Sequence, residues 1–526
     1  MAARLTTYVV VAIVAATLIA GLIAGAARDD NSGPVDLIIH HARVYDAGSP
    51  PKFADAIAIR GNKILRVGAE REIMRYRRPQ TTVIDAGGAA VLPGFNDAHA
   101  SFIAGGLARG DVHLFGATSL DDIRQRIVDW NSEHPDAAWI TGGGWSDDML
   151  SAPPTHAQLD AAVAEKPIAL RSQDGRAFWV NGKALDAAGI SRRTPDPPGG
   201  TIVRDRRGAP TGLVKDAAMA LIERSLPPAE PGARARALTA AIADAWRHGI
   251  TSVQDLGAAS GDLALYDAAR REGTLGVRVY AASHASTGSV ASLDDLARRY
   301  PDDPLLKAGL ATMSIDDPID RPSAASLGSL VAALNASGHQ VAIEASDEEA
   351  IGVALDAYDA AARQSGTETA PRNRVDNVEA AAPDDVQRIQ ALGLIASTLP
   401  LRNALLDGSL LSVFGSVRAH VAFGSDWPNL PLDPLGSIAA AVAQASDDSA
   451  PADPAKARLT IESAINAWTS GSAWASFDER RKGTIKPGML ADLVVLTSDI
   501  FKNPSQSASA AVAMTIFDGK VVYRAK

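Results

Sequence analysis

The sequence predicts an α/β protein built around a (β/α)8 TIM barrel, with a small composite β-sandwich domain from both termini, a capping insertion and an N-terminal transmembrane helix. Three observations support this prediction. Apolar strands alternate with amphipathic helices in the middle of the chain, β-rich segments flank that region, and an uncharged run lies near the N-terminus. The 526 residues suffice for one large barrel and an accessory domain.

The uncharged run covers residues 8–27 and is about as long as a membrane-spanning helix, roughly 20 residues. Arg4 and the N-terminal amine precede it, which favours a cytoplasmic N-terminus and export of the remaining chain. We therefore expect residues 1–30 to be a membrane anchor. The small residues at 24–26 leave open a cleaved signal segment, which would make the protein secreted. A buried terminal helix is the third alternative.

The composition excludes several classes of function. The net charge is −10 and no run of Lys and Arg stands out, which argues against non-specific binding to nucleic acid. The chain has no cysteine, so disulfides and thiolate metal sites are excluded.

Both ends of the globular part predict short strands and turns. Residues 56–68 form a strand, a Gly61-Asn62 turn and a second strand, a pattern typical of a hairpin. The C-terminal end has the same character, with a turn at Asp518-Gly519. We expect residues 35–92 and 478–526 to form one composite β-sandwich.

The middle of the chain, residues 93–477, predicts the parallel barrel. Helical patterns such as 233–248 and 348–363 alternate with apolar strands. The candidate strands are 249–255, 276–283, 309–315, 340–344, 394–397 and 421–424. Residues from about 112 to 214 do not fit one strand–helix unit, because prolines interrupt them repeatedly. We interpret them as an insertion that caps the mouth of the barrel.

Residues 91–101 predict the first barrel strand and the start of the site. A buried apolar strand is expected to end at Phe95, directly before Asn96, Asp97 and His99. In a parallel barrel the carboxyl ends of the strands form the active-site face. These polar residues are therefore the first candidates for chemistry.

This stretch resembles the first-strand motif of metal-dependent amidohydrolases, Pro-Gly-Phe-x-Asp-x-His-x-His. Segments 172–185, 249–257 and 424–428 resemble landmarks of amidohydrolase family 3, which includes enzymes similar to N-substituted formamide deformylase, and they follow the family's order. The resemblance implies metal-dependent hydrolysis of non-peptide carbon–nitrogen bonds. The metal would lower the pKa of a bound water and polarise the carbonyl, while an aspartate takes the proton.

The resemblance also implies a set of metal ligands, and most of their positions are substituted. The family has two histidines after the first strand, a lysine after a middle strand, two further histidines and a final aspartate. At these positions the chain has, in order, His99, Ser101, Thr312, Glu344, Asn377 and Asp426. The degenerate positions are Ser101, Thr312, Glu344 and Asn377. Among the ten histidines, only His284 also follows a predicted barrel strand.

We therefore expect no metal cofactor and an impaired enzyme that binds a small molecule or a protein partner, or serves as a scaffold. The alternative is an active hydrolase of amides or formamides. In it His99, Glu344 and Asp426 would hold one divalent metal, Zn or Mn, and Asp426 would be catalytic. A site that uses His284 or Asp255 also stays open, as does metal-free acid–base catalysis by Glu344 and Asp426.

Four further residues are expected to line the pocket. Gln173, Asp174 and Arg176 belong to the capping region, and Trp427 follows the last predicted strand. Arg176 is the expected partner of Glu344 if the insertion folds over the barrel.

Overall fold

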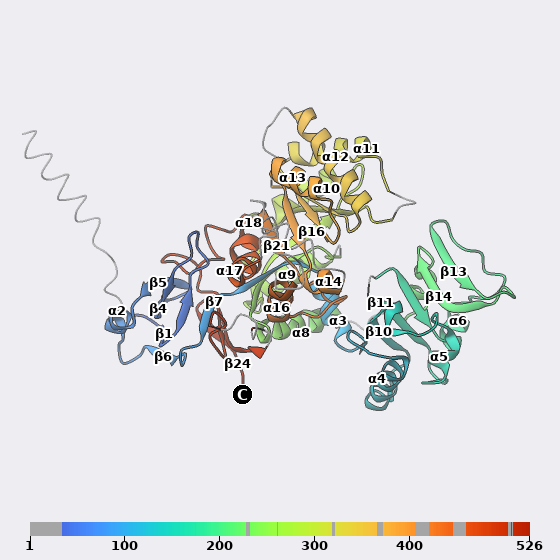
Figure 1. Cartoon of the computed structure of the whole chain (residues 1–526), viewed down its shortest axis with the longest axis horizontal. Coiled ribbons are helices and arrows are strands. Elements are labelled where there is room, and N and C mark those ends of the chain that lie inside the picture. The colour runs from blue at the N-terminus through green and yellow to red at the C-terminus, as the bar shows by residue number, and fades with distance from the viewer. Residues whose placement is uncertain are drawn as a thin grey trace, which may run out of the picture.

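The computed structural model describes residues 34–526 except 174, 228–231, 260, 318–320, 366–371, 406–419, 445–458, 503–506 and 508. Within these residues the strands form four sheets, one in the barrel, two at the chain ends and one in an insertion (Figure 1). The predicted transmembrane segment, residues 8–27, lies outside the described residues. No helix inside them is long and apolar enough to cross a bilayer.

The barrel sheet has eight parallel strands, and neighbours in the sheet follow the order of the sequence. A parallel bridge between Ala100 and Trp427 joins its last edge to its first. The nearly closed parallel barrel confirms the α/β barrel of the predicted fold class. Its strands are β8 (Phe95–Ala100), β15 (Ile250–Asp255), β16 (Arg278–His284), β17 (Leu306–Ser314), β18 (Gln340–Glu344), β19 (Arg374–Asp376), β20 (Ile395–Thr398) and β21 (His420–Phe423).

Helices cover the outside of the barrel, so the strands are buried on both faces and are mostly apolar. Helices α11 and α12 pack closely, because a Cβ on Gly328 would lie 2.9 Å from the carbonyl oxygen of Ala357. The helices are α3 (Phe102–Ala108), α8 (Ala233–Arg247), α9 (Asp262–Glu272), α10 (Val290–Arg299), α11 (Ala324–Ala336), α12 (Glu348–Ser365), α13 (Pro383–Ala391), α14 (Pro400–Leu405), α16 (Pro434–Gln444), α17 (Ile461–Asn466), the π-helical turn η3 (Ala467–Gly471) and α18 (Ser472–Ala475).

The first barrel strand differs from the prediction. The apolar residues before Gly94 form β7 (Ala90–Pro93), which pairs with strands of the sandwich, and the barrel strand β8 begins only at Phe95. His99 therefore lies within the strand and not after it. The sequence misleads here because one extended segment passes from one sheet into another through a single glycine.

The two ends of the chain together form two packed sheets. One contains β1 (Leu37–His40), β4 (Ala56–Arg60), β5 (Lys63–Gly68) and β6 (Thr82–Asp85). The other contains β2 (Arg43–Tyr45), β3 (Phe53–Ala54), β7, β22 (Leu493–Leu496), β23 (Val512–Phe517) and β24 (Lys520–Arg524). Their shared core joins residues from both ends, such as Ile57 and Leu493. Turns at Gly61 and at Asp518-Gly519 have the positive φ angles that tight hairpins need.

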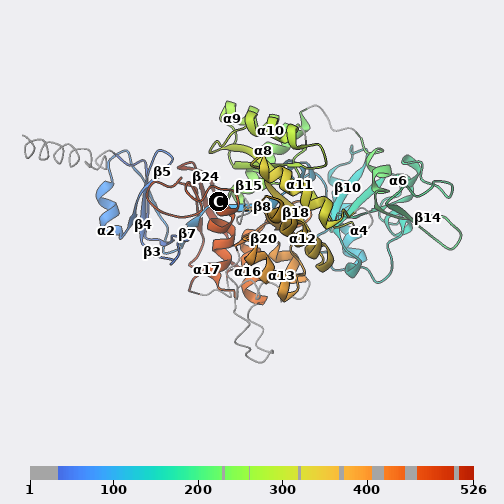
Figure 2. The same cartoon turned by 90° about the horizontal axis from the view of Figure 1, so that it is seen from above.

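A separate sheet stands between α3 and α8 in the sequence and lies at the opposite end of the molecule from the sandwich (Figures 1 and 2). Its core is distinct from that of the barrel. Its strands are β9 (Val112–His113), β10 (Ile140–Trp145), β11 (Ile168–Ser172), β12 (Ala177–Val180), β13 (Gly200–Arg204) and β14 (Pro210–Asp216), and its helices are α4 (Leu120–Glu133), η2 (Asp147–Met149), α5 (His156–Asp160), α6 (Gly182–Ala187) and α7 (Met219–Glu223).

Candidate functional site

The carboxyl ends of the barrel strands bring one histidine close to several carboxylates. His99 of β8 is only 5% exposed. Its Nδ1 lies 3.7 Å from Oδ2 of Asp376 on β19, and its Nε2 lies 3.9 Å from Oδ1 of Asp426 after β21. The first and last strands thus meet as the closed barrel requires, and His99 stands between two acidic side chains.

Arg374 fills the barrel interior beneath His99. It is fully buried, and its Nε and Nη2 donate to the two oxygens of Asp376 at 3.0 and 2.9 Å. Nη2 also donates to the carbonyl of Ala98 at 2.8 Å, and Nη1 donates to Gln254. Residues two apart on a strand face the same side, which places Arg374 and Asp376 together. The guanidinium therefore ties three barrel strands to one another.

These charges set the protonation of the network. Burial acts to lower the pKa of His99, but the carboxylates of Asp376, Glu344 and Asp426 outweigh it and raise the pKa to about 9. Burial acts to raise the pKa of Asp376, but Arg374 and His99 hold it below its ordinary value. At neutral pH the site therefore contains an imidazolium and a carboxylate.

Arg402 of α14 engages the aspartate that follows the last strand. Its Nη2 donates to Oδ2 of Asp426, and its Nε lies 3.2 Å from Oε1 of Glu379. The amide of Asn429 donates to the other oxygen of Asp426 at 3.1 Å. Asp426 has a positive φ angle of 56°, a conformation that most residues avoid. Both of its carboxylate oxygens are thus held by side chains of the protein.

Glu344 lies at the end of β18 and is paired with a hydroxyl. Oγ1 of Thr312 donates to its Oε1 at 3.2 Å. Burial raises the pKa of Glu344. Thr312 and Glu344 stand at two of the degenerate ligand positions, and here they bind each other.

Ser101 and Asn377 occupy the other two degenerate positions. Ser101 precedes α3 as its N-cap residue, and its amide donates to the carbonyl of Trp427 at 2.8 Å. Asn377 has a positive φ of 58°, and its buried Oδ1 has no hydrogen-bond partner in the part of the chain that the structure describes. Across the same residues, no three His, Cys, Asp or Glu side chains are grouped so that they could hold a metal ion.

The predicted pocket residues do not all reach the barrel mouth. Gln173 contributes its carbonyl, which accepts from Arg402 at 3.4 Å, whereas Asp174 lies outside the described residues. The expected contact between Arg176 and Glu344 is not formed. Arg176 pairs with Asp216 of the insertion at 3.1 Å, because the insertion's own sheet brings these two residues together.

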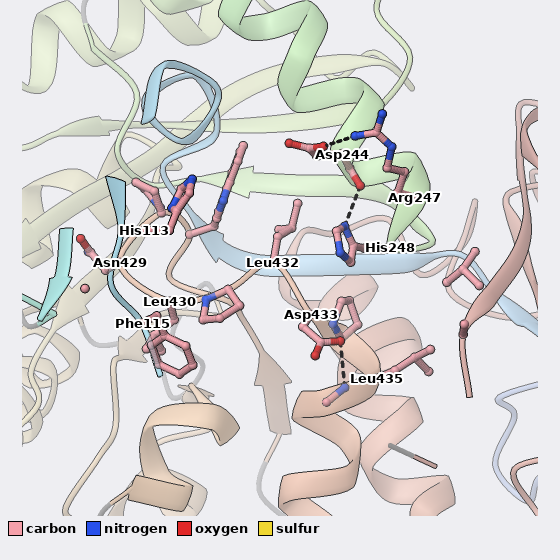
Figure 3. A pocket seen from close by; sticks show the side chains of 18 of the residues that line it. His113, Phe115, Asp244, Arg247, His248, Asn429, Leu430, Leu432, Asp433 and Leu435 are labelled. Atoms are coloured by element: carbon pink, nitrogen blue, oxygen red, sulfur yellow. Dashed lines mark hydrogen bonds and ion pairs between the residues drawn. The ribbon is translucent and has the colours of Figure 1, made fainter. Parts of the chain in front are cut away.

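The ring of Trp427 points away from the barrel interior. It packs on Phe102 of α3 with ring centroids 5.9 Å apart, and it lies over Gly105, where a Cβ would be only 2.2 Å from the ring. Trp427 borders a cleft of about 760 Å³ between the insertion, the segment 428–436, α8 and the C-terminal strand (Figure 3). Asn429 also lines this cleft and contacts Asp426, so the cleft adjoins the barrel mouth.

Two further candidates serve other purposes. Asp255 accepts a hydrogen bond from the hydroxyl of Tyr266 at 2.5 Å and one from the amide of Phe102 at 3.1 Å, so it joins β15 to two helices. His284 is exposed at the end of β16.

Sequence reasoning missed the cationic part of the site. Arg374 and Asp376 carry one usable signal, since their spacing of two puts both charges on one face of a strand. Arg402 and Glu379 carry no such signal. Arg402 reaches the site from α14 and Glu379 reaches it from the segment before α13, so the two residues meet only in the folded chain.

Comparison with known proteins identifies the family. A family model described as "Amidohydrolase family" matches residues 82–523. The chain belongs to the amidohydrolase family. Similar relatives include Protein LONG AFTER FAR-RED 3 of Arabidopsis thaliana, which is 30% identical with 93% of this chain and 91% of the relative covered, and putative amidohydrolase YtcJ of Bacillus subtilis, at 29% with 92% and 99% covered.

A third relative is N-substituted formamide deformylase of Arthrobacter pascens, 26% identical with 88% of this chain and 94% of the relative covered. Among solved structures, an uncharacterized metal-dependent hydrolase from Pyrococcus horikoshii matches with a TM-score of 0.65 at 20% identity, covering 88% of this chain and 97% of that one. Its counterpart from Pyrococcus furiosus matches with a TM-score of 0.63 at 21% identity, covering 86% and 97%. These structures share the fold.

Proposed function

We propose that this amidohydrolase-family chain binds a small-molecule ligand at a barrel mouth whose carboxylates are paired with Arg374 and Arg402. We also propose that it does not carry out the family's metal-dependent hydrolysis. One observation carries the proposal. The carboxylate of Asp426 is held on one oxygen by Arg402 and on the other by Asn429. A protein cation thus stands beside the aspartate that would bind the metal and take the proton from water.

The remaining residues do not fit the family's divalent metal. His99 is the one imidazole at the family's ligand positions, and a hydroxyl and an amide stand at two of the others, Thr312 and Asn377. Zn²⁺ sites need several imidazole, thiolate or carboxylate donors with their lone pairs free. We therefore assign no reaction step to a metal.

Metal content tests the proposal. The wild-type chain, exposed to Zn²⁺ or Mn²⁺ and dialysed, should hold well below one metal per chain by plasma mass spectrometry. Arg402→Gln should take up more metal, because it releases Asp426 and Glu379 from their guanidinium partner. Arg402→Gln combined with Asp426→Asn is the matched control and should lose that gain. Near-stoichiometric metal in the wild type, lost in Asp426→Asn, would contradict the proposal.

The second candidate is a hydrolase with one metal held by His99, Glu344 and Asp426. Its support is that the charges of Glu344 and Asp426 both act on the imidazole of His99. Its substrates would be amides or formamides, by analogy with the relative named N-substituted formamide deformylase. Turnover of an N-substituted formamide that disappears in Asp426→Asn would favour this candidate.

We also propose that the protein is held at the membrane by residues 8–27, with the globular part exported. The support is the length of the uncharged run and the basic residue before it. The alternative is secretion after cleavage near residue 26. The intact mass of the protein purified from its membrane fraction tests both. A chain that lacks its first residues and is recovered without detergent would contradict the anchor.

A further inference from the structure

A concentrated basic surface lies at the start of the β-sandwich. Residues 60–78 contain seven Lys or Arg and two Glu, a net charge of +5 in a protein whose total is −10. They form β5, the helix α2 (Glu70–Ile73) and the turn η1 (Met74–Tyr76). We call this surface the basic face. Its net charge is opposite in sign to that of the whole protein.

The cations of the basic face are available for a ligand. Arg66, Arg71, Arg75 and Arg77 are exposed, and among the described residues no acidic side chain lies within ion-pair distance of any of them. The guanidinium of Arg78 donates to the carbonyls of Arg75 and Arg77 at 3.0 and 2.8 Å. Unpaired guanidinium groups are suited to bind phosphate oxygens through bidentate hydrogen bonds.

The basic face is also concave. A cavity of about 480 Å³ is lined by Arg66, Arg75, Arg78 and Tyr76, with Glu72 at its side. Three arginines thus converge on a space that can receive a phosphate-sized group. The tyrosine ring gives the space an amphipathic wall, of the kind that is enriched where protein meets the surface of a membrane.

The chain enters the globular part at this same face. Nε of Arg60 donates to the carbonyl of Pro34 at 3.2 Å, and Val35 packs with Ile73 and Tyr76 in one small core. Pro34 follows Ala27, the end of the uncharged run, by seven positions, with six residues between them. A fully extended chain of that length reaches about 25 Å at most. A membrane anchor at residues 8–27 would therefore keep the basic face within that distance of the bilayer.

We propose that the basic face binds the anionic phosphate headgroups of the membrane in which the chain is anchored. The inference rests on the proposed anchor. Helix α2 lies at the end of the molecule opposite the capping insertion (Figures 1 and 2), so binding at this face points the insertion away from the membrane. Charge attraction between basic groups and anionic lipids acts within about 10 Å at ordinary salt, which the short tether permits.

The test uses the full chain in lipid nanodiscs. Because the chain has no cysteine, Gln80→Cys gives a single fluorophore site, exposed and two residues after Arg78. A spin-labelled phosphatidylcholine headgroup quenches the fluorophore at short range. We expect at least twofold stronger quenching in phosphatidylglycerol discs than in phosphatidylcholine discs, and loss of the difference in 1 M NaCl.

Matched variants separate charge at this face from overall charge. Arg71→Gln, Arg75→Gln and Arg77→Gln together should abolish the difference between lipids. Arg192→Gln, Arg193→Gln and Arg206→Gln remove the same charge from exposed positions of the insertion and should preserve it. The salt titration of the wild type needs no substitution, so it decides the matter even if the first variant folds poorly.

Three outcomes would overturn the proposal. The first is equal quenching in both lipids. The second is a variant of the basic face that keeps the full difference in quenching between the two lipids. The third is a difference that inorganic phosphate removes but chloride at equal ionic strength does not. The last would assign the cavity to a soluble phosphate. A chain that fails to enter either disc would instead contradict the anchor itself.

Discussion

The buried pair of Arg374 and Asp376 yields a stability prediction that can be worked out from the structure. Both side chains are fully buried and share two hydrogen bonds of 3.0 and 2.9 Å. Arg374→Met leaves the buried carboxylate of Asp376 without its hydrogen-bonded cation, and the imidazolium of His99, 3.7 Å away, stays as its neighbouring positive charge. Removing one partner of a buried pair typically costs about 3–5 kcal/mol. We expect the free energy of unfolding to fall by that amount.

The double variant separates the cost of an unpaired charge from the value of the pair. Arg374→Met with Asp376→Asn removes both charges, and replacing a whole buried pair is often close to neutral. Gln254 and the carbonyl of Ala98 still lose their donor, which costs about 1–3 kcal/mol for a buried acceptor left unmatched. We therefore expect the double variant to be more stable than Arg374→Met alone.

Urea unfolding at pH 7, followed by tryptophan fluorescence, measures these free energies. The exposed pair Arg298–Asp295 provides the control, because both side chains are 71% exposed and such pairs contribute about 0–1 kcal/mol. The reasoning is refuted if the double variant loses as much stability as Arg374→Met alone and Asp376→Asn alone lose when their two losses are added. In that case the network would stabilise the fold through its hydrogen bonds and not through its charges.

Two further predictions concern the same end of the barrel. The pKa of His99 in the folded state is about 9, above its unfolded value of about 6.5. The stabilisation of the folded state by protonated His99 is therefore fully present below pH 6.5 and is lost as the pH rises through 9. The stability difference between wild type and His99→Gln should therefore shrink by about 3 kcal/mol between pH 6.5 and 10, and a constant difference would contradict the shift. Gly105→Ala should cost about 1–3 kcal/mol in thermal unfolding, because the new Cβ would lie 2.2 Å from the ring of Trp427. The control Gly110→Ala meets nothing nearer than 3.9 Å and should change stability little.

The fold could be predicted from the sequence because the strand–helix alternation is repeated and strongly apolar. Six of the predicted strands are present, with ends shifted by at most three residues. The sixth barrel strand, β19, is absent from the prediction, because it has only three residues, Arg374–Asp376, and two of them are charged. A run that short has no measurable periodicity.

The site could be predicted only in part. The positions of His99 and Asp426 follow from the barrel, because its first and last strands must be neighbours. Their partners do not follow, because Arg374 reaches across the barrel interior and Arg402 comes from a helix. A side chain of that length can reach many neighbours, and only the packed structure selects one.

The composite β-sandwich limits when the protein can fold during synthesis. Strand β7 pairs with β22, which follows about 400 residues later, and β7 continues through Gly94 into the first barrel strand. Since a ribosome releases the N-terminal end first, the earliest strands must wait for the last ones. A chain that stops before β22 would present the open edge of β7, and such edges promote aggregation. Incomplete translation products should therefore be cleared by proteases and not accumulate as folded barrels.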